Sequence, residues 1–309
     1  MKKVSFSIIL TLFIVLFSLN SCNKNDFKDT ITTTEIHNNL TISKEVINSM
    51  SEFNTNFINN SDTTLINHTY GWYKDLCYAV YIAAADLIGA GGGIAAAKEL
   101  IAAAGIATGG TGAAVLTLVC ATVGGALASA QAHDYLYGIN SMQVQDDSPI
   151  WINQIINDFP DTLLQKVGIY HNDYLKKVIY GNVSQSNWLN NIPNNNYINI
   201  EQSQQFINYL NTSKSIMSNY VDTQSSKNVI QQFYNQGYFS QNVKLVLINY
   251  LQVFFQIKNP SDLSDITNFY VSQIAFENNG LTKNDRETLY AAFSTGYNSL
   301  PFWINTLSK

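Results

Sequence analysis

The stretch Leu87-Ile-Gly-Ala-Gly-Gly-Gly-Ile-Ala-Ala-Ala97 decides the fold of this 309-residue chain. Alanine has the highest helix propensity of all residues, and the alanine-rich pattern continues past the break at Gly109-Gly110-Thr111-Gly112. The pattern predicts two helices, over about 73–107 and 113–137. Because so short a break joins them, we expect them to fold back on one another as a hairpin within residues 71–140.

Small residues recur four positions apart in this hairpin, a spacing that lets helix backbones approach closely. Lys98 and Glu99 fall in the middle of the first helix, where each would cost about 2.5–3.5 kcal/mol at the centre of a bilayer. A buried hairpin is therefore the first interpretation, and reversible membrane insertion or a released bacteriocin-like peptide are the alternatives. The predicted packing residues are Gly89, Gly93, Gly105, Gly109, Gly124 and Gly125.

Two polar residues of the hairpin stand at matching distances from its turn. With the turn centred at Gly110, Asp86 lies 24 residues before it and Asp134 lies 24 after it, so His133 is predicted beside Asp86. An aspartate and a histidine together can serve in acid–base catalysis, but they are more often a structural pair at a helix end. The same geometry separates Cys77 from Cys120 by roughly 30 Å, which excludes a disulfide.

The N-terminus has the features of an exported lipoprotein. Met1-Lys2-Lys3 is basic, and the uncharged run from Val4 to Leu19 has the length of a signal-peptide core, short of the roughly 20 apolar residues of a spanning helix. The run ends in Leu19-Asn-Ser-Cys22, which looks like the signal for attaching lipid to Cys22. We expect a signal peptide over 1–21 and a lipidated, polar tether over 22–41. Asn23 after the cysteine is typical of sorting to the outer membrane.

The rest of the chain carries the apolar spacing of helices, with almost no alternation of period two. Residues 42–70 predict one amphipathic helix, and residues 149–309 predict a multi-helix domain with a loop over 181–199. In its last helix, over 282–299, Thr282 and Asp285 form a capping-box pattern. The predicted fold class is all-α. The remaining helical segments are expected at 163–179, 201–221, 224–236, 240–257 and 261–278.

Composition gives little support to several functions. The net charge is −5 with no basic cluster, so nucleic-acid binding lacks electrostatic support. The four histidines are scattered, and the chain contains no HExxH, GxSxG, CxxC or phosphate-binding loop pattern. We therefore predict no catalytic residues, no metal site and no cofactor.

Three segments carry a resemblance to a family. Val167-Gly-Ile-Tyr-His171-Asn172-Asp-Tyr-Leu175 resembles the V-G-x-x-H-N-x-x-L segment of many uncharacterised exported lipoproteins of the Bacteroidetes type. The C-terminal run through Ser299 to Trp303 resembles their ending, and the Asp86-Leu-Ile-Gly-Ala run resembles the start of their Gly/Ala-rich part. The resemblance implies a periplasmic or surface lipoprotein and no particular activity. His171 and Asn172 could position a ligand, or His171 could pack beneath its helix while Asn172 caps a neighbouring element.

The sequence leaves two functions open. The first is a non-catalytic lipoprotein of the cell envelope, held at the outer membrane by its N-terminal lipid, whose helical domain binds a protein or lipid partner. The second is a membrane-active or antibacterial protein that acts through the Gly/Ala-rich hairpin.

Overall fold

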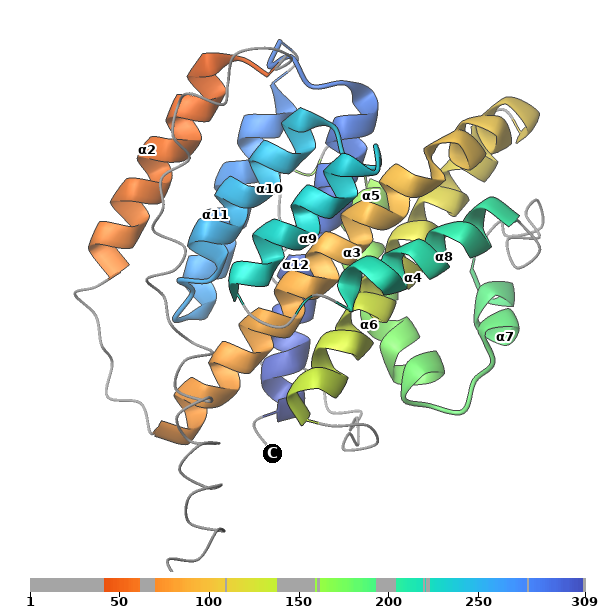
Figure 1. The fold of residues 1–309 in the computed structure, drawn as a ribbon, viewed down its shortest axis with the longest axis horizontal. Coiled ribbons are helices and arrows are strands. Elements are labelled where there is room, and N and C mark those ends of the chain that lie inside the picture. Colours follow the sequence, from red (N-terminus) through yellow and green to blue (C-terminus); the bar gives the residue numbers. More distant parts are fainter. Residues whose placement is uncertain are drawn as a thin grey trace, which may run out of the picture.

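In the computed structural model the described residues are 42–61, 70–108, 110–137, 159, 162–192, 204–218, 220, 223–276 and 278–307. Every regular element within these residues is a helix, so the predicted all-α class is confirmed (Figure 1). The predicted signal peptide over 1–21, Cys22 and the predicted tether over 22–41 lie outside the described residues.

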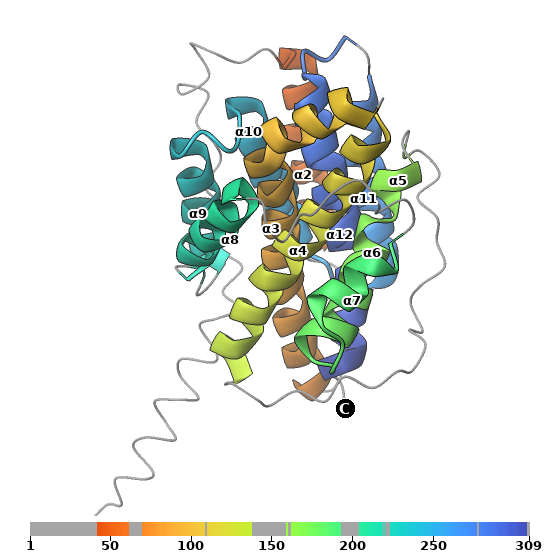
Figure 2. The same ribbon diagram turned by 90° about the vertical axis from the view of Figure 1, so that its right-hand side faces the viewer.

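A pair of long helices forms the centre of the fold. Helix α3 spans Tyr70–Thr108 and helix α4 spans Thr111–Tyr137, close to the predicted bounds. The chain reverses at Gly110, whose φ of 100° lies in the region that glycine adopts most readily. The two helices then run back along each other as the most extensively packed pair in the described part of the chain (Figures 1 and 2).

The last helix packs against this pair. Helix α12 spans Lys283–Leu307 and lies along α3. Its capping box is confirmed, because the Thr282 backbone N–H donates to Asp285 Oδ2 at 3.1 Å and the Asp285 N–H donates to Thr282 Oγ1 at 3.1 Å. The predicted end at Ser299 is wrong, since the helix continues through Pro301. Ser299 and Trp303, on either side of that proline, both donate buried hydrogen bonds to Asp86, and these contacts keep the helix continuous.

The other helices surround the central three (Figure 2). The predicted loop over 181–199 contains a short helix, α7, which the sequence analysis missed. Ser184 caps α7 by accepting a hydrogen bond from the Asn187 N–H at 3.2 Å, and Trp188 is buried against Tyr174. The surrounding elements are α2 (Lys44–Ser61), α5 (Thr162–Gln165), α6 (Val167–Tyr174), the π-helix η3 (Leu175–Ile179), α7 (Gln185–Asn190), α8 (Gln204–Met217), α9 (Thr223–Asn235), α10 (Gln241–Phe254) and α11 (Pro260–Ala275).

One hydrophobic core joins segments that the sequence analysis treated as separate parts. Buried side chains from α2, from the α3–α4 pair and from the C-terminal helices belong to a single cluster. Asn54 of α2 shows the connection, because its amide donates to the Asn249 carbonyl at 2.8 Å and accepts from the Tyr270 hydroxyl at 2.8 Å. The amphipathic helix, the hairpin and the C-terminal region therefore share one interior.

Both central helices are long and apolar enough to cross a membrane, by length and composition only. In this fold, 94% of the most apolar window of α3 and 78% of that of α4 are buried inside the protein. Lys98 and Glu99 are exposed, and the Lys98 ammonium reaches the Gly237 carbonyl at 3.5 Å. The charges that argue against a bilayer crossing thus lie at the protein surface.

The helix pair is closest at Gly89. A Cβ atom added there would lie 2.5 Å from both the Gly124 carbonyl oxygen and the Ala128 Cβ. Of the other predicted packing residues, Gly105 approaches Ala113, Gly93 and Gly124 are buried, and Gly109 lies outside the described residues.

We expect Gly89→Ala to lower the free energy of unfolding by about 1–3 kcal/mol, because its methyl group meets backbone that cannot move aside. Gly91→Ala is the matched control two residues away, where the nearest atom, the Ala292 Cβ, lies at an ordinary 3.5 Å. That substitution should be neutral or stabilising by up to about 1 kcal/mol, the helix propensity gained. Urea unfolding of both variants makes the comparison, and equal stabilities would contradict the close approach.

Candidate functional site

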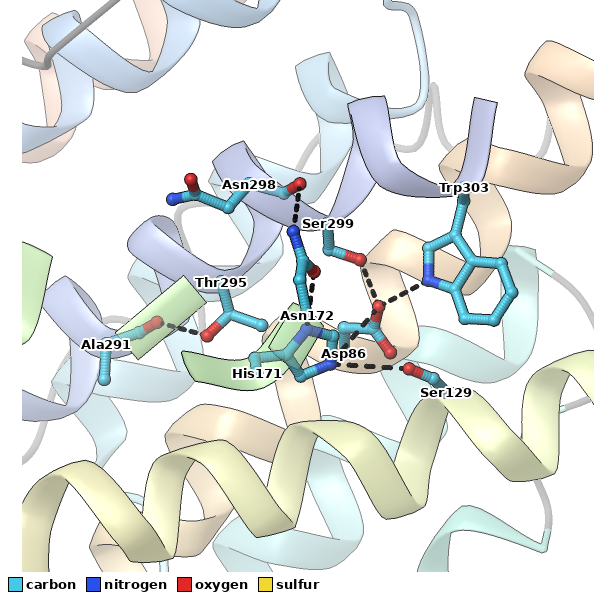
Figure 3. Close-up of polar contacts among 9 residues, drawn as sticks. All are labelled: Asp86, Ser129, His171, Asn172, Ala291, Thr295, Asn298, Ser299 and Trp303. Atoms are coloured by element: carbon cyan, nitrogen blue, oxygen red, sulfur yellow. Dashed lines mark hydrogen bonds and ion pairs between the residues drawn. The ribbon is translucent and has the colours of Figure 1, made fainter. Parts of the chain in front are cut away.

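Six polar or aromatic side chains from four helices meet in the interior, between α3, α4, α6 and α12 (Figure 3). We call them the Asp86 cluster. Five of the six members are completely buried, and Asn172 is partly buried. The cluster consists of Asp86 on α3, Ser129 on α4, His171 and Asn172 on α6, and Ser299 and Trp303 on α12.

The Asp86 carboxylate receives its contacts at one oxygen. Oδ2 accepts hydrogen bonds from the Ser299 hydroxyl and from the Trp303 indole N–H, the latter at 2.8 Å, and lies 3.6 Å from His171 Nε2. Oδ1 has no hydrogen-bond partner within the described residues. Because an uncompensated buried charge is very costly, the hydrogen-bond donors and the histidine are what make Asp86 tolerable here.

The proton arrangement of His171 follows from its neighbour. The Asn172 Nδ2 group donates to the Asn298 carbonyl at 3.0 Å, which turns the Asn172 Oδ1 toward His171 Nδ1 at 3.0 Å. An amide oxygen only accepts, so Nδ1 carries a proton, and Nε2 faces Asp86.

Two glycines make room for this histidine. A Cβ atom on Gly125 would lie 2.9 Å from the His171 ring and 3.1 Å from the Asp86 carbonyl oxygen. A Cβ atom on Gly168, one turn before His171, would collide with the Ser294 carbonyl oxygen. Gly168 instead places its N–H 3.2 Å from the Ser294 hydroxyl, which accepts the hydrogen bond, so α6 packs directly on α12. Gly125, predicted as a helix-packing residue, thus lies against the cluster.

The geometry differs from a catalytic triad. In a triad the carboxylate and the nucleophile lie at opposite nitrogens of the histidine. Here both Asp86 Oδ2 and Ser129 Oγ, at 3.6 and 3.4 Å, face the same atom, His171 Nε2. With the other nitrogen bound to Asn172 and the ring completely buried, the arrangement is suited to joining helices rather than to activating a serine.

Asp86 pairs with His171 rather than with His133. The Asp86 carbonyl lies against Gly125, and His133 is eight residues further along α4, about two helical turns. The hairpin register therefore differs from the one that a symmetric turn gives, since the turn of α3 that carries Asp86 meets α4 at Gly125.

His133 occupies an aromatic site next to the cluster. Its ring stacks on Trp303, with centroids 5.6 Å apart, and on Tyr137 at 5.2 Å. Burial lowers the pKa of His133 from its ordinary 6.5, and the Asp134 carboxylate, 3.6 Å away, opposes this effect. Burial also raises the pKa of the neighbouring Tyr180 hydroxyl. These groups are held in their neutral forms, which suits a packed interior.

The structure brings together residues that the sequence analysis considered separately. The three segments that carry the family resemblance supply Asp86, the His171–Asn172 pair, and Ser299 with Trp303. Ser129 was missed, since a serine in an alanine-rich helix gives no signal. The four-residue spacing of Ser299 and Trp303 places them on one helix face. This spacing indicates a site only once Asp86, which both side chains contact, is known to lie beside them.

Within the described ranges, no three or more histidine, cysteine, aspartate or glutamate side chains lie close enough together to hold a metal ion. Cys77 and Cys120 form no disulfide with each other, as the sequence predicts. Comparisons of the chain with protein-family models, with curated proteins and with solved structures found no match.

Proposed function

We propose that the chain is a non-catalytic lipoprotein of the cell envelope, attached to the outer membrane through lipid on Cys22, with a helical body that binds a partner. The observation that carries the proposal is the burial of the Asp86 cluster away from solvent. Its acid and base are completely buried, and its serine and carboxylate compete for one nitrogen. Such a cluster connects four helices into a rigid body.

The proposed role of the hairpin is to be the core of that body. A lipid on Cys22 already supplies membrane attachment, so the apolar helices α3 and α4 do not have to span a bilayer to keep the protein there. The burial of their most apolar windows supports this role. The resemblance to exported lipoproteins of the Bacteroidetes type and the Leu19-Asn-Ser-Cys22 signal support the location.

A surface pocket of about 320 Å³ offers a place for a partner's side chain or another small group. Two aromatic rings, Phe53 and Phe57, form its apolar wall, and amide, carboxylate and ammonium groups surround it. A few polar groups around an apolar wall are what a specific binding pocket requires. The lining residues are Phe53, Asn56, Phe57, Asn60, Lys258, Asn259, Asp262 and Asp265.

Metabolic labelling with palmitate tests the anchor. The wild-type chain and a Cys77→Ala variant should incorporate label, and Cys22→Ala should not, because only Cys22 follows a lipoprotein signal. Equal labelling of Cys22→Ala and wild type would overturn the lipoprotein assignment.

A second candidate function is membrane activity of the hairpin, which one observation favours: both central helices are long and apolar enough to span a bilayer. Release of a trapped dye from vesicles by the mature chain separates the two functions. Leakage at micromolar protein would favour a membrane-active protein, and intact vesicles favour the binding protein.

A further inference from the structure

We infer that the tip of the α3–α4 hairpin is a membrane-contact surface that docks the protein body on the bilayer carrying its own lipid anchor. This inference rests on the proposed lipidation of Cys22 and adds an orientation to it. The tip is defined as residues 100–108 and 110–114.

The tip is uncharged and carries exposed apolar side chains. The sequence contains no charged residue between Glu99 and Asp134. Ala102, Ala103 and Ala114 are exposed at the tip, and the Ile106 side chain is 88% exposed, more than any other large hydrophobic side chain within the described residues. An exposed isoleucine on an uncharged surface is unfavourable in water and favourable at the boundary between lipid headgroups and acyl chains.

The tether joins the body at the same end of the molecule as the tip. The N–H of Ile42, the first described residue, donates to the Asn242 side chain in the first turn of α10 at 3.4 Å. Lys98, two turns before Ile106, reaches the Gly237 carbonyl in the turn that precedes α10. The start of α2 and the hairpin tip accordingly lie at the same end of the molecule, the upper end in both ribbon views (Figures 1 and 2).

A second exposed apolar side chain lies at this end. Phe276 follows the last residue of α11 and is 61% exposed. Its loop is fixed to the start of α2, because the Ser43 N–H donates to the Asn279 carbonyl at 2.8 Å. Ile106 and Phe276 are thus two apolar contacts on the end of the body at which the tether arrives.

The tether is long enough to connect a lipid in the bilayer to the start of α2. Twenty residues, 22–41, separate the anchoring cysteine from Ile42, and fully extended they span at most about 70 Å. Because the lipid keeps the body near the membrane, even a weak contact made by a few apolar side chains is effective. In this orientation the pocket beside Phe57, near the far end of α2, faces away from the bilayer and is free for a partner.

The charges near the tip predict how the contact responds to salt. Lys98 stands beside Glu99, and Lys44 beside Glu45, all of them exposed. Because the signs are balanced, the contact depends on apolar burial rather than on attraction to anionic lipids, and it should persist in high salt.

The test uses the full mature lipoprotein in vesicles of phosphatidylethanolamine and phosphatidylglycerol, in a Cys77→Ala background. An environment-sensitive fluorophore is attached at Ile106→Cys and Phe276→Cys. The controls are Tyr135→Cys and Ile169→Cys, whose native side chains are 59% and 58% exposed. Tyr135 lies 24 residues along α4 from Thr111, about 36 Å from the tip. Cys120 is buried, and burial raises the pKa of its thiol, so it stays unlabelled.

We expect lipid-borne quenchers to reduce the fluorescence at Ile106 and Phe276 about threefold more than at the two controls, in low and high salt. Equal quenching at all four positions, in protein that floats with the vesicles, would overturn the inference while leaving the anchor intact. Shielding of Ile106 in whole cells but not in vesicles would also overturn it, since a protein would then cover the tip. Loss of flotation in the wild type, with no difference from Cys22→Ala, would instead contradict the anchor.

Discussion

Asp86→Ala should lower the free energy of unfolding by about 3–5 kcal/mol, the order of loss when one member of a buried, hydrogen-bonded polar cluster is removed. The substitution leaves two hydrogen-bond donors without their acceptor in a dry interior, the Trp303 indole N–H and the Ser299 hydroxyl, and removes the carboxyl that faces His171 Nε2 at 3.6 Å. Urea unfolding, monitored by circular dichroism, measures the change.

The matched control is Asp265→Ala on α11, because that aspartate is exposed and its removal should change the stability by no more than about 0.5 kcal/mol. A double-mutant cycle with His171→Ala then isolates the pair. If Asp86 and His171 act together, the double variant is more stable than the sum of the single losses predicts, by about 0.5–3 kcal/mol. Additive losses would show that the two groups are not coupled.

Trp303→Ala should also cost about 3–5 kcal/mol, as expected for truncating a large aromatic side chain in the core. The Trp303 indole is completely buried, stacks on His133 and hydrogen-bonds to Asp86, so its removal leaves a cavity beside a carboxylate that has lost a donor.

Trp303→Phe separates these two contributions. The phenyl ring keeps most of the packing against His133 but has no N–H to donate, so we expect a loss of about 1–3 kcal/mol. A phenylalanine variant as unstable as the alanine variant would mean that the hydrogen bond, and not the packing, dominates. One as stable as wild type would contradict the role assigned to the Asp86 contact.

Local patterns predict much of the secondary structure because they act within a few residues. The Gly109–Gly112 break, the Thr282–Asp285 capping box and the three- and four-residue apolar spacing each depend on the nearest turns of chain. Where a distant contact overrides a local preference, the prediction fails. Helix α7 forms in a segment rich in asparagine because Trp188 is buried against Tyr174 and donates to Asp173 at 2.9 Å.

Helix α12 shows the same limit. Pro301 is a local signal to stop, but Ser299 and Trp303 on either side of it both bind Asp86, more than 200 residues earlier in the chain. Those contacts offset the loss of one backbone hydrogen bond. No pattern within α12 reveals this, because the partner is known only once α3 is in place.

The sequence by itself determined an all-α chain with a Gly/Ala-rich helical pair at its centre, because helix propensity and apolar periodicity are local properties. Only the tertiary structure decided that Asp86 pairs with His171 and not with His133, because His171 comes from α6, whose position against the hairpin depends on packing between distant segments. It also decided that Lys98 and Glu99 lie at the surface, and that Ile106 stands exposed at the end of the molecule where α2 begins. These depend on how the whole interior is filled, which no single segment of the chain specifies.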